Sequence, residues 1–238
     1  TNNRGGWAKL EFSKTEHLTS EGYFTYLKEF KGGHSLNAVA GYSYFEKNGE
    51  NFNAENYDFG VEGLKYWDLG AGSYLTDGKA AMGSGKNITE RLFALYARAN
   101  YSYNDKYMVS ATIRHEGSSK FAAENRWGNF WRVSAEEFMK EFDWVSDLKV
   151  RFGYGVTGNN DFDASYMANT LSRDQYWMLP SGSWAYVYGP SSNVNPYLGW
   201  EEKKEWNIGV DYSFFGNRMY GKFDYYRRKI DGMIYEVN

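Results

Sequence analysis

The stretch Arg91–Glu116 reads RLFALYARANYSYNDKYMVSATIRHE and decides the fold. Apolar and polar side chains alternate from Phe93 to Tyr103, and the alternation resumes after the short segment Asn104–Lys106. Alternation of period two in two arms across an Asn/Asp turn predicts an antiparallel β-hairpin. Each arm has about ten residues, which is long for a globular strand and suits a tilted strand that crosses a membrane. Tyrosines bracket the turn on the apolar face, as in the aromatic girdle of a transmembrane barrel.

The composition agrees with a chain of strands. Of 238 residues, 20% are aromatic, 26 are Gly and only 3 are Pro, which favours strands joined by glycine turns over helices. No apolar run approaches the roughly 18 residues of a membrane helix, but transmembrane strands hide their apolar half in alternation. The absence of Cys excludes disulfides and thiolate metal sites, and the formal charge of −3 disfavours nucleic acid as a partner. Because Thr1 replaces an initiator Met, we expect a mature or partial chain.

The same alternation predicts about nine strands along the chain. Outside the hairpin they lie at residues 7–14, 22–30, 35–45, 129–135, 148–157, 206–214 and 219–228. Residues 129–135 are short for a membrane strand, which needs about 9–11 residues. Long loops are expected at about 46–89, 117–128 and 158–204, and short turns near 31–33, 104–106, 138–147 and 215–218. Long external loops and short periplasmic turns are typical of outer-membrane barrels, which close with an even number of strands, so residues 1–238 are predicted to form part of a larger barrel.

Several segments resemble one known family in order and spacing. They are Tyr107–Phe121 (YMVSATIRHEGSSKF), Asn125–Gly128 (NRWG), Asp147–Arg151 (DLKVR), Tyr154–Asn159 (YGVTGN), Asn195-Pro196, Trp200-Glu201, Trp206–Asp211 (WNIGVD) and Tyr42 within Ala40-Gly41-Tyr42. The chain resembles the C-terminal barrel half of SusC/RagA-type TonB-dependent outer-membrane transporters. The resemblance covers most of the chain and is most specific from Tyr107 to Asn159.

The resemblance implies a barrel of roughly 22 strands with a plugged lumen. It also implies import of oligosaccharides or peptides across a bacterial outer membrane, energised by TonB, with a SusD-like surface lipoprotein over the external loops. The plug, the TonB-binding segment and the early strands are absent from these residues, so no energy-coupling residue can be assigned. In a second departure, the family has a Gly-Trp-containing stretch where Ala135 here runs directly into Glu136.

Aromatic side chains in the last long loop are the candidate binding residues. Trp and Tyr faces stack on sugar rings and also anchor protein interfaces. The candidates for contact with ligand or lipoprotein are Trp177, Trp184, Tyr186, Tyr188 and Trp200. The alternative is that these rings pack the loop on itself or on neighbouring loops.

A row of charged residues is predicted on the inward face of the strands. It consists of Arg98, Arg114, Lys149, Arg151, Lys222, Asp224 and Arg228. These side chains could contact a plug or line a conduit, but a solvated wall with cross-strand ion pairs is the favoured interpretation.

No catalytic, metal or cofactor site is predicted. The adjacent carboxylates Glu136-Glu137 and Glu201-Glu202 point to opposite faces of a strand, so neither pair can act jointly on a substrate. The three His residues are scattered, without the spacing of a zinc site. The sequence therefore predicts a transporter rather than an enzyme. The alternative is a soluble or surface-exposed all-β glycan-binding module, in which a second sheet would cover the apolar face.

Overall fold

The computed structural model describes residues 6–60, 63, 67–87, 89–139, 144–162, 171–190, 195 and 197–234, with the backbone alone at 171–175 and 188–190. Strands dominate these residues. The named helices are the 3-10 turn η2 (Leu69–Ala71) and the single-turn α1 (Ser73–Thr76). Within the described part of the chain, no helix has the length and apolar character needed to cross a membrane.

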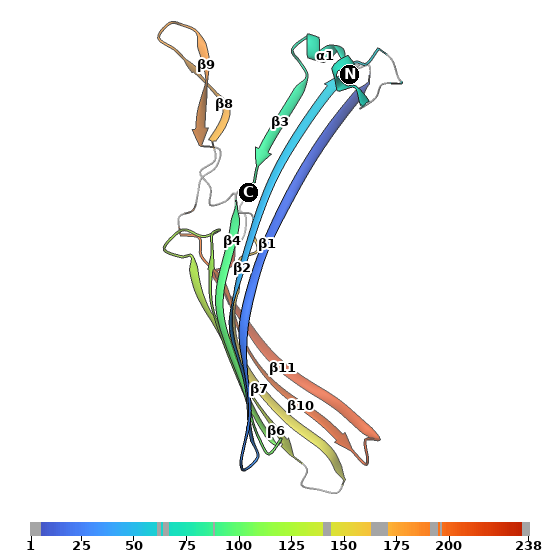
Figure 1. Cartoon of the computed structure of the whole chain (residues 1–238), viewed down its shortest axis with the longest axis vertical. Helices are drawn as coiled ribbons and strands as arrows, with labels where there is room; N and C mark the ends of the chain where they lie inside the picture. Colours follow the sequence, from blue (N-terminus) through green and yellow to red (C-terminus); the bar gives the residue numbers. More distant parts are fainter. Residues whose placement is uncertain are drawn as a thin grey trace. The chain divides into compact units, whose positions relative to one another are not determined.

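Eight strands lie side by side in their order along the chain (Figure 1). They are β1 (Trp7–Phe30), β2 (His34–Tyr57), β4 (Glu90–Tyr103), β5 (Tyr107–Ser118), β6 (Trp127–Met139), β7 (Val145–Asn159), β10 (Glu201–Phe214) and β11 (Met219–Asp231). Neighbours from β4 to β11 are antiparallel. A ninth strand, β3 (Ala81–Lys86), pairs with β2, and β8 (Leu171–Met178) and β9 (Trp184–Pro190) form a separate two-stranded sheet. In this order β1 and β11 are the two edges, so the described sheet is open.

Tight turns join the strands at one end because the sequence supplies residues that accept positive φ. Between β4 and β5, Asn104 and Asp105 have φ of 50° and 52°, and the Lys106 amide donates to the Tyr103 carbonyl at 3.0 Å. Positive φ at both central residues is what a type I′ hairpin turn requires. Gly33, between β1 and β2, has φ of 79°, and a side chain there would also collide with Asn104 of the next turn.

The strand register gives the sheet one apolar and one polar face. Across β5 and β6, Ile113 pairs with Trp131 and Ala111 with Val133, whereas Arg132 pairs with Thr112. The same separation continues on β10 and β11, where the apolar pairs Val210–Phe223 and Ile208–Tyr225 alternate with charged or small residues. The predicted alternation is therefore carried through the hydrogen-bonded register of these strands.

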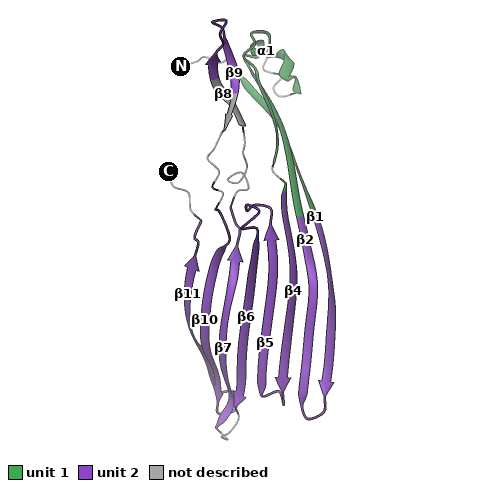
Figure 2. Cartoon of the chain, turned by 90° about the vertical axis from the view of Figure 1, so that its left-hand side faces the viewer, with its two compact units in different colours: residues 1–18, 46–89 green, residues 19–45, 90–238 purple. Residues whose placement is uncertain are grey.

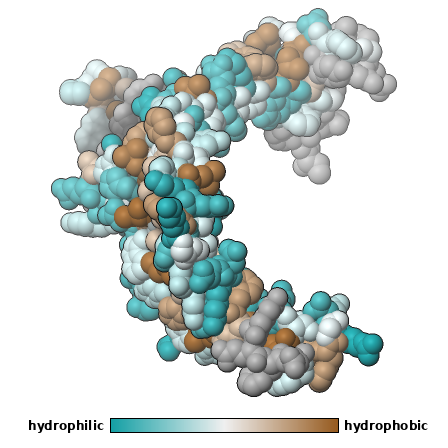
Figure 3. Space-filling view, turned by 60° about the horizontal axis from the view of Figure 1, so that its bottom comes forward, coloured by the Kyte–Doolittle hydropathy of each residue, from teal (hydrophilic) through white to brown (hydrophobic). Residues whose placement is uncertain are grey.

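Among the residues that the structure describes, no second layer covers the apolar face of the sheet. The accessible surface of the chain is 17515 Å², whereas a compact soluble protein of this mass exposes about 11,000 Å². Large apolar side chains such as Phe152 and Ile208 are exposed, and Figure 3 shows apolar groups on the surface. Among the described residues, only six hydrophobic side chains are buried. A sandwich would bury this face, so the soluble-module alternative is not favoured.

Several strands are longer than predicted. The strands expected at 7–14 and 22–30 are a single 24-residue strand, β1, and β2 extends 24 residues to Tyr57. Residues 129–135 belong to the 13-residue strand β6, so the prediction of a short strand there was wrong. The segments expected as unstructured loops at 46–89 and 158–204 contain the end of β2 with β3, and the β8–β9 hairpin. The end of β2 is polar on both faces, so alternation could not reveal it. In β8 and β9 the aromatic residues were interpreted as loop residues because the two strands are short and irregular in register.

The chain divides into two compact units, coloured in Figure 2. The first comprises residues 1–18 and 46–89. Its best-buried polar residue is Asn56, whose amide donates to the carbonyls of Leu69 and Gly72 at 2.7 and 2.8 Å and so holds the η2 turn against β2. The second comprises residues 19–45 and 90–238 and contains β4 to β11 with the remaining parts of β1 and β2.

Candidate functional site

Cross-strand ion pairs cover the polar face from β6 to β11. Arg151 on β7 bridges two strands, since its Nη2 lies 2.8 Å from Asp211 Oδ1 on β10 and 2.9 Å from Asp224 Oδ1 on β11. Lys149 reaches Glu136 on β6 at 2.5 Å. Arg228 Nε lies 2.8 Å from Glu205 Oε2. Such partly exposed pairs contribute only about 0–1 kcal/mol each to the stability of the fold.

The predicted inward row is thus largely engaged with its own sheet. Arg114 makes two 2.8 Å bonds to Glu116 on the same strand, and Arg98 Nε donates to Asn100 at 3.1 Å. This arrangement favours the interpretation that these side chains form a solvated wall over the interpretation that they bind a ligand. The acidic partners Glu136, Glu205 and Asp211 were absent from the predicted row, although their even spacing with the basic residues could have indicated them.

Glycines on the polar face make room for these guanidinium groups. A Cβ at Gly155 would come within 3.0 Å of the Arg132 side chain, and one at Gly209 would come within 2.8 Å of Arg151 Nη2. Side chains of the neighbouring strands therefore occupy the space beside these glycines. A hollow of about 160 Å³ remains beside them, lined by Arg132, Gly153, Tyr154, Gly155, Thr157, Lys203, Glu205 and Asn207.

An aromatic cluster closes the polar face at the long-loop end of β5, β6, β7 and β10. Phe121 is 2% exposed and contacts Phe162 and Trp200 at ring-centroid distances of 5.2 and 4.9 Å. Phe130 packs edge-on against Trp200 at 5.0 Å. Glycines at 128 and 158 are required because a Cβ at either would overlap the Phe130 ring.

Lys120 connects residues 160–162, which follow β7, to this cluster. Its Nζ lies 2.8 Å from the Phe162 carbonyl and 3.3 Å from Glu90 Oε2 on β4. Asn160 donates to the buried Ser118 hydroxyl at 3.3 Å. No local pattern in the sequence joins Phe121, Phe130 and Lys120, although the GSSKF segment that contains two of them is part of the family resemblance.

Trp200 is a member of this cluster. Besides its two ring contacts, its indole Nε1 donates to the Arg126 carbonyl at 3.0 Å. Of the alternatives for this residue, the geometry favours packing among neighbouring loops over contact with a ligand.

The other candidate aromatics lie on the β8–β9 hairpin. Trp177 and Trp184 are 66% and 67% exposed, and Tyr186 is also exposed. Tyr186 accepts a 2.6 Å hydrogen bond from the hydroxyl of Tyr176, its register partner. Register places Tyr176, Met178, Trp184 and Tyr186 on one face of the hairpin and Trp177 on the other. Tyr188 belongs to β9, but its side chain lies outside the described residues.

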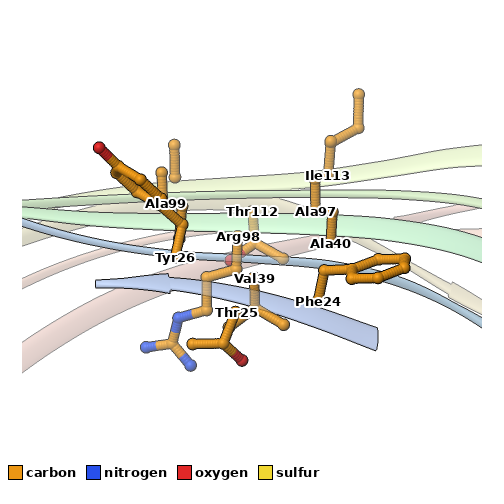
Figure 4. A pocket seen from close by; sticks show the side chains of 12 residues that line it. Phe24, Thr25, Tyr26, Val39, Ala40, Ala97, Arg98, Ala99, Thr112 and Ile113 are labelled. Atoms are coloured by element: carbon orange, nitrogen blue, oxygen red, sulfur yellow. The ribbon is translucent and has the colours of Figure 1, made fainter. Parts of the chain in front are cut away.

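A groove of about 640 Å³ lies on the apolar face of β1, β2, β4 and β5 (Figure 4). Its floor consists of Ala38, Ala40, Ala97, Ala99 and Ala111, and Phe24, Tyr26 and Ile113 rise beside it. Figure 4 shows Ile113 and Arg98 pointing to opposite sides of the sheet. The groove is therefore formed mainly by small side chains of the apolar face.

Comparison with known proteins identifies the fold that combines these two faces. The family model described as TonB dependent receptor-like, beta-barrel matches residues 1–238. The chain belongs to this family. Members of the TonB-dependent receptor family are β-barrels of the bacterial outer membrane, so the open sheet is part of an outer-membrane barrel, and the predicted localisation is confirmed.

Individual relatives confirm the predicted SusC/RagA resemblance. The TonB-dependent receptor SusC of Bacteroides thetaiotaomicron is 34% identical over 154 residues, which are 61% of this chain and 15% of SusC. A TonB-dependent receptor of Formosa agariphila is 33% identical over 234 residues, 92% of this chain and 21% of the receptor. In the structure of the RagAB peptide transporter, one chain matches 97% of this chain with a TM-score of 0.76 and 24% identity. The match covers 25% of that chain, so the 238 residues span about a quarter or less of the relatives' length.

Proposed function

We propose that the whole protein is a TonB-dependent importer of oligosaccharides or peptides that acts with a SusD-like surface lipoprotein. The observation that carries the proposal is the sheet itself, with an uncovered apolar face for lipid and a polar, ion-paired face for an aqueous lumen. The family match and the similarity to SusC and to the RagAB peptide transporter support it.

The proposed topology directs the tight turns toward the periplasm. Residues 31–33, 104–106 and 215–218 join strands at one end, and β6 is joined to β7 at the same end. The longer segments, including the β8–β9 hairpin, leave from the other end and would face the outside. This polarity is that of bacterial outer-membrane barrels, whose external loops are long.

Transport itself would involve no covalent chemistry by these residues. The ligand would be held at the external mouth by the loops and the lipoprotein. It would then pass along the polar wall once TonB displaces a plug supplied by another part of the protein. Within this scheme Trp177, Trp184 and Tyr186 are proposed contacts for ligand or lipoprotein, with Tyr188 as a further candidate from the sequence alone.

Uptake by intact cells tests this proposal. Cells that produce the full-length protein and its lipoprotein would be supplied with fluorescent oligosaccharide and peptide mixtures, with and without TonB. We expect accumulation of one class of ligand that disappears without TonB and without the transporter gene. Accumulation that persists without TonB, or recovery of the protein in the soluble fraction, would reject the proposal.

A further inference from the structure

Cations gather on the apolar face of β10 and β11 near the long-loop end. Along β11, Phe223, Tyr225, Arg227 and Lys229 share this face, and the register pairs Arg227 with Trp206 and Lys229 with Lys204. The ring centroids of Trp206 and Tyr225 lie 5.4 Å apart. The face therefore passes from apolar residues to an aromatic pair and then to three cations.

This order is that of a membrane boundary. Tyr and Trp rings occupy the level of the lipid headgroups, and cations beyond them meet the phosphates. The neighbouring strands lack such charges at this end, since β7 has Val156 and β6 has Trp131 and Asn129 on the same face. The basic group is therefore a local feature of β10 and β11.

The group has a surplus cation. Lys204 Nζ lies 3.0 Å from Asp231 and 3.3 Å from Glu202, and Lys229 lies 2.7 Å from Asp231. Three cations face two carboxylates, which leaves a charge of 3 − 2 = +1. Arg227, the cation next to the aromatic pair, is exposed and has no ion pair or hydrogen bond with any residue that the structure describes.

We propose that Arg227, flanked by Lys204 and Lys229, binds the phosphate of a membrane lipid headgroup. This inference rests on the proposed placement of the apolar face in the bilayer. The planar guanidinium can donate two parallel N–H hydrogen bonds to phosphate oxygens. The two lysines add positive charge near the phosphate but lack this paired geometry. The acyl chains of the same lipid would lie along Tyr225 and Phe223 on the apolar side.

Native mass spectrometry of the full-length protein tests the site. Delipidated protein in detergent would be titrated with phosphatidylglycerol or with a galactolipid of the same acyl chains, which lacks phosphate. We expect Arg227→Gln to lower the retention of phosphatidylglycerol roughly tenfold, as fits the loss of a charge-assisted hydrogen bond, and to leave galactolipid binding unchanged. Lys222→Gln, on the polar face of the same strand, is the matched control and should retain both lipids.

Two further comparisons keep the proposal falsifiable. Arg227→Lys, which preserves the charge, should lose less phosphatidylglycerol than Arg227→Gln, and heat-modifiable migration in galactolipid reports whether each variant still folds as a barrel. Equal loss of both lipids, or unfolding of Arg227→Gln without phosphate present, would assign the side chain to contacts with the adjacent barrel strand and overturn the proposal. Displacement of phosphatidylglycerol by millimolar inorganic phosphate would show a site for free phosphate instead. Failure of the barrel to fold in every variant and in the wild type would reject the proposed function rather than this site.

Discussion

Single residues on the two faces of β5 should respond oppositely to charge. Ile113 is 53% exposed on the apolar face, whereas Thr112 beside it lies on the polar face. Ile113→Arg is expected to cost about 2–4 kcal/mol of barrel stability if it sits near the bilayer midplane. Thr112→Arg, the matched control, should change stability by no more than about 0.5 kcal/mol. Urea unfolding of the full-length protein in lipid vesicles measures both variants, and a similar small effect at both positions would place Ile113 in water.

Two tryptophans that looked alike in the sequence should differ strongly in their structural role. Trp200 packs on Phe121 and Phe130, whereas Trp177 projects from its hairpin. Trp200→Ala should therefore destabilise the full-length protein by about 3–5 kcal/mol, as expected when a packed aromatic side chain is removed. Trp177→Ala should cost at most about 0.5 kcal/mol. The same unfolding assay decides the matter, and equal stability of the two variants would mean that the aromatic cluster is not a packing unit.

At the scale of elements, the sequence revealed strands wherever one face must meet lipid. The hairpin of β4 and β5 and the pair β10 and β11 were predicted because residues such as Ala111 and Val210 recur at every second position. The middle of β1, residues 15–21, and the end of β2, residues 46–57, were not predicted because both faces there are largely polar. Strand β6 was predicted too short because Glu136 and Glu137 break the alternation, although both pair in register with β7.

The candidate site was harder to predict than the strands. In the sequence, Trp177, Trp184 and Trp200 are equally good candidates for binding a ligand. Only the long-range contacts of Trp200 in the folded chain distinguish it from the other two. The packing of Trp200 against Phe121 joins residues 79 positions apart (200 − 121 = 79), which no local pattern encodes.

The β8–β9 hairpin is an element that should contribute to recognition more than to folding. Residues 175–187 carry no charge and expose two Trp and two Tyr, a composition typical of the centre of a protein interface. An isolated two-stranded hairpin is marginally stable, so a partner surface would stabilise it. Because Leu171 and Pro190 are paired, a short Gly-Ser linker can replace residues 171–190 without separating the flanking chain.

This replacement should leave the unfolding midpoint of the full-length protein unchanged and reduce co-purification of the proposed surface lipoprotein at least about tenfold, as loss of an aromatic hot spot would. Quantitative pull-down from solubilised membranes measures the effect. The control is Tyr197→Ala, which removes an exposed aromatic side chain outside the hairpin and should leave the lipoprotein bound. Unchanged lipoprotein with lost ligand uptake would instead assign the hairpin to the ligand.

For the molecule as a whole, the two faces explain why an apparently hydrophilic chain belongs in a membrane. About half of each spanning strand is apolar, but it faces one side only, and the other side carries ion pairs such as Arg151 with Asp211 and Asp224. The open edges at β1 and β11 agree with a chain that spans about a quarter or less of its relatives. In the proposed function, the substrate would depend on loops, a plug and a partner that a strand pattern does not encode.

The central claim is that one face of β5 contacts lipid and the other contacts water. The most direct test is a series of single cysteines from Val109 to Ile113 in the full-length protein, after replacement of any Cys outside these 238 residues, which contain none. Each cysteine would be spin-labelled in lipid vesicles, and its collision rates with oxygen and with a water-soluble nickel chelate would be measured. We predict oxygen-dominated collisions at 109, 111 and 113 and chelate-dominated collisions at 110 and 112. Low accessibility to both agents at the odd positions would mean that protein covers the apolar face, which would contradict the barrel account.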